Sequence, residues 1–107
     1  MDGFDLGNMM GMLGGLQQKI QQMQAEAATT RCEGSAGGGL VRVVCTGDQN
    51  ILEVHIKPEA TEDPEMLEDL VRAATNEALR NAKQTMMDAM KQAAGGLPIP
   101  PGMIPGL

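Results

Sequence analysis

The sequence predicts an α+β fold in which one helix precedes three antiparallel strands and a second, longer helix follows them. Apolar residues recur every three or four positions near the N-terminus and again after Pro64, and they alternate with polar residues between Thr29 and Lys57. At 107 residues, with one aromatic residue and ten methionines, the chain supports one domain with a modest core. We expect such a core to share surface with a second copy.

The first helix is predicted over residues 8–28. Its apolar residues are spaced by alternating steps of four and three, as in a heptad seam, and most of the remaining positions are glutamine. Two interpretations are open: the helix packs on its own sheet, or it pairs with a helix of another subunit. The seam consists of Met9, Leu13, Leu16, Ile20, Met23 and Ala27.

A three-stranded antiparallel meander is predicted over residues 29–57. One face of the meander is apolar and the other is charged, which is typical of a sheet covered by helices on one side. The predicted strands TTRCE, LVRVVCT and ILEVHIK are separated by the flexible stretch GSAGGG and by the turn GDQN.

The residues with the softest metal-ligating or nucleophilic atoms are Cys32, Cys45 and His55. Strand alternation places both cysteines on the apolar face and the histidine on the charged face, so the three cannot close on one zinc ion. We predict buried thiols that act as small apolar side chains, a solvated histidine, no metal or other cofactor, and no catalytic residue. An enzyme is not expected.

The second helix is predicted over residues 64–94. Asp63 is a suitable capping residue, Pro64 suits the first helical position, and Gly95-Gly96 can end the helix. Thirty residues give a rod of roughly 45 Å, which is longer than a three-stranded meander covers. We therefore expect part of this helix to project or to meet a second subunit. A flexible tail rich in Pro and Gly is predicted over residues 95–107.

Four of the eight basic residues in the chain fall on one face of the second helix: Arg72, Arg80, Lys83 and Lys91. They can be an ordinary solvent face, since bases toward the end of a helix complement its dipole. They can also bind phosphate. The net charge of −6 argues against a general nucleic-acid binder, but salt screens charges beyond about 8 Å, so a local basic surface can still attract DNA.

The stretches GGLVRVVCTGDQNILEVHIKPE and EMLEDLVRAATNEA resemble the YbaB/EbfC family of small bacterial nucleoid-associated proteins. The stretches LGNMM, QQKIQQMQAE and LPIPPGM are also similar to that family, so the resemblance spans nearly the whole chain. We predict a single domain of this kind over residues 1–94. It implies an α-β-β-β-α homodimer with long projecting helices, binding to double-stranded DNA with little sequence preference, and no enzymatic activity.

The basic residues agree only partly with this resemblance. Lys19 and Arg80 match the family pattern, whereas lysine is usual in relatives where Gly11 and Gln22 stand, and a basic pair where Leu52-Glu53 stands. We predict DNA contacts from the helices rather than the sheet, through Lys19, Arg72, Arg80, Lys83 and Lys91. The predicted dimer interface comprises Leu13, Leu16, Ile20, Met23, Leu79, Met86 and Met90.

The sequence thus favours a homodimer of the cytoplasm and nucleoid that binds DNA backbone phosphates and influences nucleoid organisation and gene expression. The alternative is a dimeric protein-interaction module with weak or lost DNA binding. Its ten methionines suit an adaptable apolar contact surface, and the missing basic positions favour it. No apolar run approaches the length of a membrane-spanning helix, and we expect neither a membrane nor a small-molecule substrate as partner.

Overall fold

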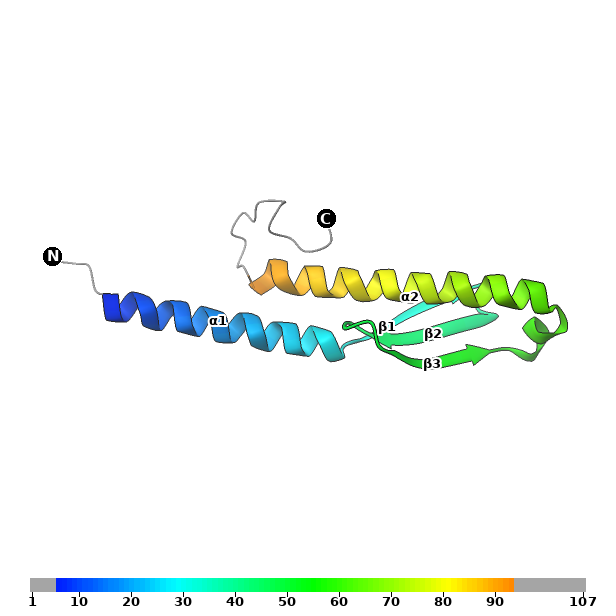
Figure 1. Cartoon of the computed structure of the whole chain (residues 1–107), viewed down its shortest axis with the longest axis horizontal. Helices are drawn as coiled ribbons and strands as arrows, with labels where there is room; N and C mark the ends of the chain where they lie inside the picture. The colour runs from blue at the N-terminus through cyan, green and yellow to red at the C-terminus, as the bar shows by residue number, and fades with distance from the viewer. Residues whose placement is uncertain (1–5, 94–107) are drawn as a thin grey trace.

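The computed structural model describes residues 6–93, in which a long helix lies along one face of a small sheet (Figure 1). The elements are α1 (Leu6–Thr29), β1 (Arg31–Ala36), β2 (Val41–Thr46), β3 (Ile51–Ile56), a short 3-10 helix η1 (Pro58–Glu62) and α2 (Pro64–Ala93). This order confirms the predicted α-β-β-β-α fold. The predicted tail, residues 95–107, lies outside the described residues.

The sheet is antiparallel, with the strands in the order β1-β2-β3. Cys32 lies opposite Cys45, and Val43 lies opposite Val54, so these four residues belong to one face. An irregularity between Val44 and Cys45 shifts the pairing of β2 with β3 by one residue. The core forms where α2 packs on this face, against β1 and β2.

The core is built from small and branched side chains, because β1 and α2 approach each other closely. Ala74, Ala78 and Ala82 of α2 are fully buried against Val43 and Cys45 of β2. Small residues at steps of four give the helix a flat stripe on which the strands can lie. The predicted apolar face of the second helix is therefore confirmed.

The prediction of a flexible GSAGGG stretch is wrong in its first half. Gly34, Ser35 and Ala36 extend β1, and only residues 37–40 form the turn. Glycine is needed at position 34 of this strand, because a Cβ there would lie 2.3 Å from the Ala78 amide nitrogen of α2. The turn itself needs glycine, since Gly37, Gly38 and Gly39 all have positive φ.

The boundary between α1 and β1 also differs from the prediction, which gave Thr29 and Thr30 to the first strand. Thr29 ends α1, and the Thr30 hydroxyl donates a hydrogen bond to the Glu26 carbonyl oxygen at 2.8 Å. Hydroxyl groups of this kind satisfy the free carbonyls at a helix end. The strand therefore begins at Arg31.

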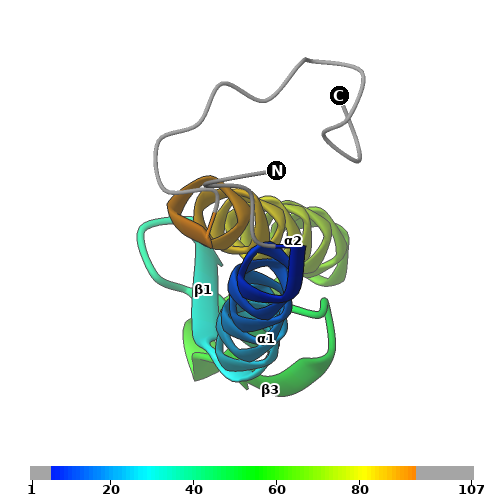
Figure 2. The same ribbon diagram turned by 90° about the vertical axis from the view of Figure 1, so that its left-hand side faces the viewer.

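The molecule is elongated, with extents of 76 × 23 × 16 Å. The end of α2 runs past the sheet and lies beside the second half of α1, while the first half of α1 continues beyond α2 (Figures 1 and 2). The end of the seam packs within the chain, where Ala27 is buried, whereas Leu13 and Leu16 are exposed, so the pairing of this helix with one of another subunit stays a prediction.

Candidate nucleic-acid interface

The four basic residues of α2 form what we call the basic stripe: Arg72, Arg80, Lys83 and Lys91. All four are exposed, as is Lys19 on α1. The helix that carries the stripe begins where the Asp63 carboxylate accepts a hydrogen bond from the Met66 amide at 3.2 Å, which confirms the predicted cap. From Arg72 to Lys91 the stripe is roughly 28 Å long.

The members of the basic stripe differ in their surroundings. Arg72 Nη2 lies 3.1 Å from the Asp69 Oδ1, although both side chains are about 70% exposed and such a pair contributes little. Among residues 6–93, Arg80 and Lys91 make no ion pair, and neither does Lys19. The strongest positive surface of α2 therefore lies in its second half.

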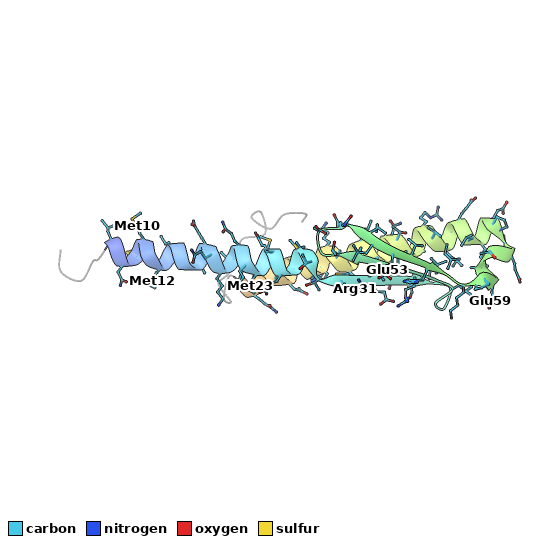
Figure 3. All side chains as sticks on the ribbon, turned by 90° about the horizontal axis from the view of Figure 1, so that it is seen from below. Met10, Met12, Met23, Arg31, Glu53 and Glu59 are labelled. Atoms are coloured by element: carbon cyan, nitrogen blue, oxygen red, sulfur yellow. The ribbon has the colours of Figure 1, made fainter. Side chains whose placement is uncertain are left out.

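A cluster of six exposed carboxylates, the acidic end, occupies residues 58–69, which contain no lysine or arginine. These six carboxylates account for the whole net charge of −6, because the rest of the chain carries as many basic as acidic side chains. Figure 3 shows Glu59 at the opposite end of the long axis from Met10 and Met12. The acidic end consists of Glu59, Glu62, Asp63, Glu65, Glu68 and Asp69.

The arginines on the outer face of the sheet form ion pairs with carboxylates. Arg31 forms an ion pair with Glu53 across β2 (Figure 3). Arg42 Nη1 lies 2.9 Å from Glu33 Oε1. The hydrogen bond and charge of Arg31 lower the pKa of the Glu53 carboxyl below its ordinary value. The sheet therefore offers little free positive charge.

The structure brings the predicted interface residues to three different places. Leu13 and Leu16 are exposed on the part of α1 that projects past α2, whereas Leu79 packs at the margin of the core. The others are half-buried where α1 and α2 lie side by side: Ile20, Met23, Met86 and Met90.

A second exposed apolar surface lies on β3, and its exposure, unlike its apolar character, was not predicted. Val54 and Ile56 lie on the core face of the sheet, opposite Val43 and Val41, yet they are 49% and 41% exposed. The reason is that α2 covers β1 and β2 and leaves β3 beyond its edge. Strand alternation identifies the face of these residues, but the position of the helix over the sheet decides whether they are covered.

A methionine-lined groove of about 560 Å³ lies where the end of α1, the β2–β3 turn and α2 meet. Met86, Met87 and Met90 form its apolar wall, and Lys83 of the basic stripe lies at the same groove. Gly47 allows this junction, because a Cβ there would lie 1.9 Å from the Ala27 carbonyl oxygen.

The described part of the chain holds no group of three or more His, Cys, Asp or Glu side chains that could ligate a metal ion. As predicted, Cys32 and Cys45 are buried and His55 is exposed on the opposite face. No helix within residues 6–93 is long and apolar enough to cross a membrane.

Comparison with known proteins gives a match along almost the whole chain. Residues 2–97 match the model of the YbaB/EbfC DNA-binding family. A nucleoid-associated protein of Maricaulis maris is 43% identical over 101 residues, covering 92% of this chain and 94% of that protein. Another, from Caldanaerobacter subterraneus subsp. tengcongensis, is 40% identical over 100 residues, covering 92% and 90%.

The fold also has a counterpart among solved structures. The crystal structure of an uncharacterised protein from Helicobacter pylori superimposes with a TM-score of 0.66 at 21% identity. The match covers 89% of this chain and 99% of the other. At this identity the likeness concerns the fold alone.

Proposed function

Because this chain belongs to the YbaB/EbfC DNA-binding family, we propose that it binds double-stranded DNA through backbone phosphates with little sequence preference. The observation that carries this proposal is the exposed basic surface on the second half of α2. Arg80 and Lys91 make no ion pair within the described residues. Unpaired arginine and lysine on a helix surface can displace counterions from DNA, which is the main source of non-specific affinity.

The acidic end does not prevent this binding. Asp69 and Lys83 are separated by fourteen residues of α2, or roughly 21 Å, which is more than twice the screening length of about 8 Å at physiological salt. The bulk charge of −6 is therefore a poor guide to the field at the basic stripe. Phosphate contacts fix the position of a protein on the duplex but carry no direct sequence information.

The proposal is tested by reversing two charges of the basic stripe. We expect Arg80→Glu/Lys83→Glu to weaken binding to a labelled duplex by at least about tenfold, and to make the salt dependence shallower. The wild-type log–log salt slope should be no steeper than about −7, the value for eight contacts in a dimer. Titrations at about 50 and 200 mM salt measure both quantities.

A matched control carries the same change in net charge on the sheet. Arg31→Glu/Arg42→Glu should reduce binding much less, because Arg31 already pairs with Glu53 and Arg42 with Glu33. Circular dichroism establishes that both variants are folded. Equal losses in the two variants, or unchanged binding after reversal at Arg80 and Lys83, would remove the basic stripe from the DNA interface.

We also propose that the working form is a homodimer. The exposed apolar face of β3, at Val54 and Ile56, continues the buried core face of the sheet. A core face left open to water favours association, since each square ångström of apolar surface removed from water contributes about 25 cal/mol. The dimer interface then includes this face in addition to the exposed seam of α1.

The cellular setting that we propose is the nucleoid. The relatives from Maricaulis maris and Caldanaerobacter subterraneus are named nucleoid-associated proteins. Binding through phosphates without base readout would let the protein occupy many sites, and so influence nucleoid organisation and gene expression. Chromatin precipitation followed by sequencing should give broad genomic coverage rather than a few sharp peaks.

A second candidate function is favoured by the methionine-lined groove. Flexible thioether side chains at Met86, Met87 and Met90 can adapt to apolar side chains of a partner protein. Pull-down from nuclease-treated lysate separates the two functions: specific partners that survive DNA removal support docking, and their complete loss supports DNA binding. Met87→Gln in the groove should release such partners without changing duplex affinity.

A further inference from the structure

Two cysteines face each other across adjacent strands in the centre of the core. Cys32 of β1 is the register partner of Cys45 of β2, and both thiols are free. Both side chains point toward α2: the Cys45 thiol donates to the Ala78 carbonyl oxygen at 3.3 Å, and the Cys32 sulfur lies 3.4 Å from the Thr85 hydroxyl. The pair thus lies on one face of one hairpin.

This arrangement matches what an intramolecular disulfide needs. Directly opposed residues of an antiparallel pair have Cα atoms about 4.5 or 5.5 Å apart, depending on the type of pair. Both values fall within the range of about 4.4 to 6.8 Å found for bridged cysteines. A bond between Cys32 and Cys45 therefore needs rotation of two side chains rather than movement of the strands.

The two thiols differ in access to solvent. Cys32 is 7% exposed, whereas Cys45 is completely buried. Burial, together with the neighbouring Cys32, raises the pKa of the Cys45 thiol, which keeps Cys45 protonated and slow to react with an external oxidant. Cys32 is therefore the residue that a small oxidant reaches first.

We propose that Cys32 and Cys45 form a reversible intramolecular disulfide when the protein meets hydrogen peroxide. Peroxide oxidises the Cys32 thiol to a sulfenic acid and is itself reduced to water. The Cys45 sulfur then attacks the Cys32 sulfur, forming the S–S bond, and the sulfenic oxygen leaves as a second water. The two electrons lost by the pair of thiols are those gained by the peroxide.

The proposal is tested on the full reduced chain. After peroxide treatment, alkylation under denaturing conditions and mass spectrometry should find a peptide linked through Cys32 and Cys45, with two hydrogen atoms lost and both free thiols gone. The product should migrate as one chain on a denaturing gel, and dithiothreitol should restore both thiols. Singly oxidised sulfinic or sulfonic cysteine, a disulfide between chains, or unreacted thiols would overturn the proposal.

The order of the steps gives a second, independent measurement. In Cys45→Ala the sulfenic acid on Cys32 has no thiol to resolve it, so a dimedone adduct should accumulate at Cys32. Cys32→Ala should give little adduct at the buried Cys45. More labelling of Cys45 than of Cys32 would contradict the proposed order.

A positive control uses another pair of the same hairpin. Ser35 and Arg42 are also register partners, but both are exposed on the outer face of the sheet. The variant S35C/R42C, in a background carrying C32A and C45A, should cross-link under the same treatment and faster than the native pair. If this exposed pair closes while the native pair stays reduced, burial prevents the reaction and the proposal fails.

Discussion

Gly34 shows at the scale of one residue how the helix is held to the sheet. A Cβ at this position would lie 2.3 Å from both the Ala74 carbonyl oxygen and the Ala78 amide nitrogen. Both atoms belong to the backbone of α2, so they can move away only if the helix moves. The missing side chain therefore sets the distance between β1 and α2.

We expect Gly34→Ala to destabilise the fold by about 3 kcal/mol, because the added methyl group forces α2 away from β1. Urea denaturation followed by circular dichroism measures the free energy of unfolding. Ser35→Ala is the matched control, since Ser35 is the next residue of β1 and is exposed on the other face. It should change the free energy of unfolding by less than about 0.5 kcal/mol. Similar losses in both variants would mean that β1 and α2 are not this close.

Glu53 links stability to pH on the outer face of the sheet. The Arg31 hydrogen bond and charge lower the pKa of this carboxyl from its ordinary value of 4.5. A group with a lower pKa in the folded state binds fewer protons there than in the unfolded state. Its contribution to stability is therefore present above pH 4.5 and is lost as the pH falls through the lowered pKa.

The prediction concerns the slope of melting temperature against pH below pH 4.5. Glu53→Gln should flatten the slope in that range, since glutamine cannot be protonated there. Arg31→Gln should have a similar effect, because it removes the largest cause of the shift. The double variant should add little to either single change. Additive effects of the two substitutions would show that the pair is not coupled.

At the scale of single residues, the sequence predicts a feature correctly when neighbouring residues in the chain cause it. The Asp63 cap and the burial of both cysteines follow from nearest neighbours and strand alternation, and they were predicted correctly. The role of Gly34 could not be predicted, because its constraint comes from Ala74 and Ala78, some forty residues away. The glycine-rich stretch that begins at Gly34 was interpreted as flexible, whereas glycine stands at this position because β1 and α2 pack closely.

At the scale of elements, β3 illustrates the same limit. The alternation of ILEVHIK correctly assigned Val54 and Ile56 to the apolar face. The alternation could not show that α2 covers β1 and β2 but leaves β3 open, because the strands that a helix covers depend on where the helix crosses the sheet. The candidate site is similar: periodicity gathers the basic stripe on one side of α2, but the pairing of Arg72 with Asp69 needs coordinates.

The proposed role of β3 leads to a prediction about assembly. Val54→Asp should convert the homodimer to a monomer, because a carboxylate on the proposed contact face would have to be buried without a partner. Sedimentation velocity across a range of concentrations measures the change. His55→Asp is the control, since His55 is next in the same strand and exposed on the opposite face. A wild-type chain that sediments as a monomer, or a dimeric Val54→Asp variant, would contradict the proposed interface.

At the scale of the whole molecule, charge is separated along the long axis. The acidic end, residues 58–69, contributes six carboxylates, and the remaining residues are balanced. Lys91 lies twenty-two residues of helix from Asp69, or roughly 33 Å. The same total charge spread evenly would repel DNA everywhere, whereas this distribution confines the repulsion to one end. In the proposed complex it would also orient the protein, since the acidic end is driven away from the duplex.

This separation predicts how salt changes the influence of the acidic end on DNA binding. The quadruple variant Glu59→Gln/Glu62→Gln/Glu65→Gln/Glu68→Gln should bind duplex with less than about twofold higher affinity at 0.15 M salt, where the screening length is about 8 Å. At about 0.01 M salt the screening length reaches about 30 Å, so the same variant should bind clearly more tightly than the wild type. Fluorescence anisotropy at the two salt concentrations measures both differences. A large gain at 0.15 M would mean that the acidic end lies close to bound DNA, and that α2 meets the duplex near its first turns rather than at Arg80 and Lys83.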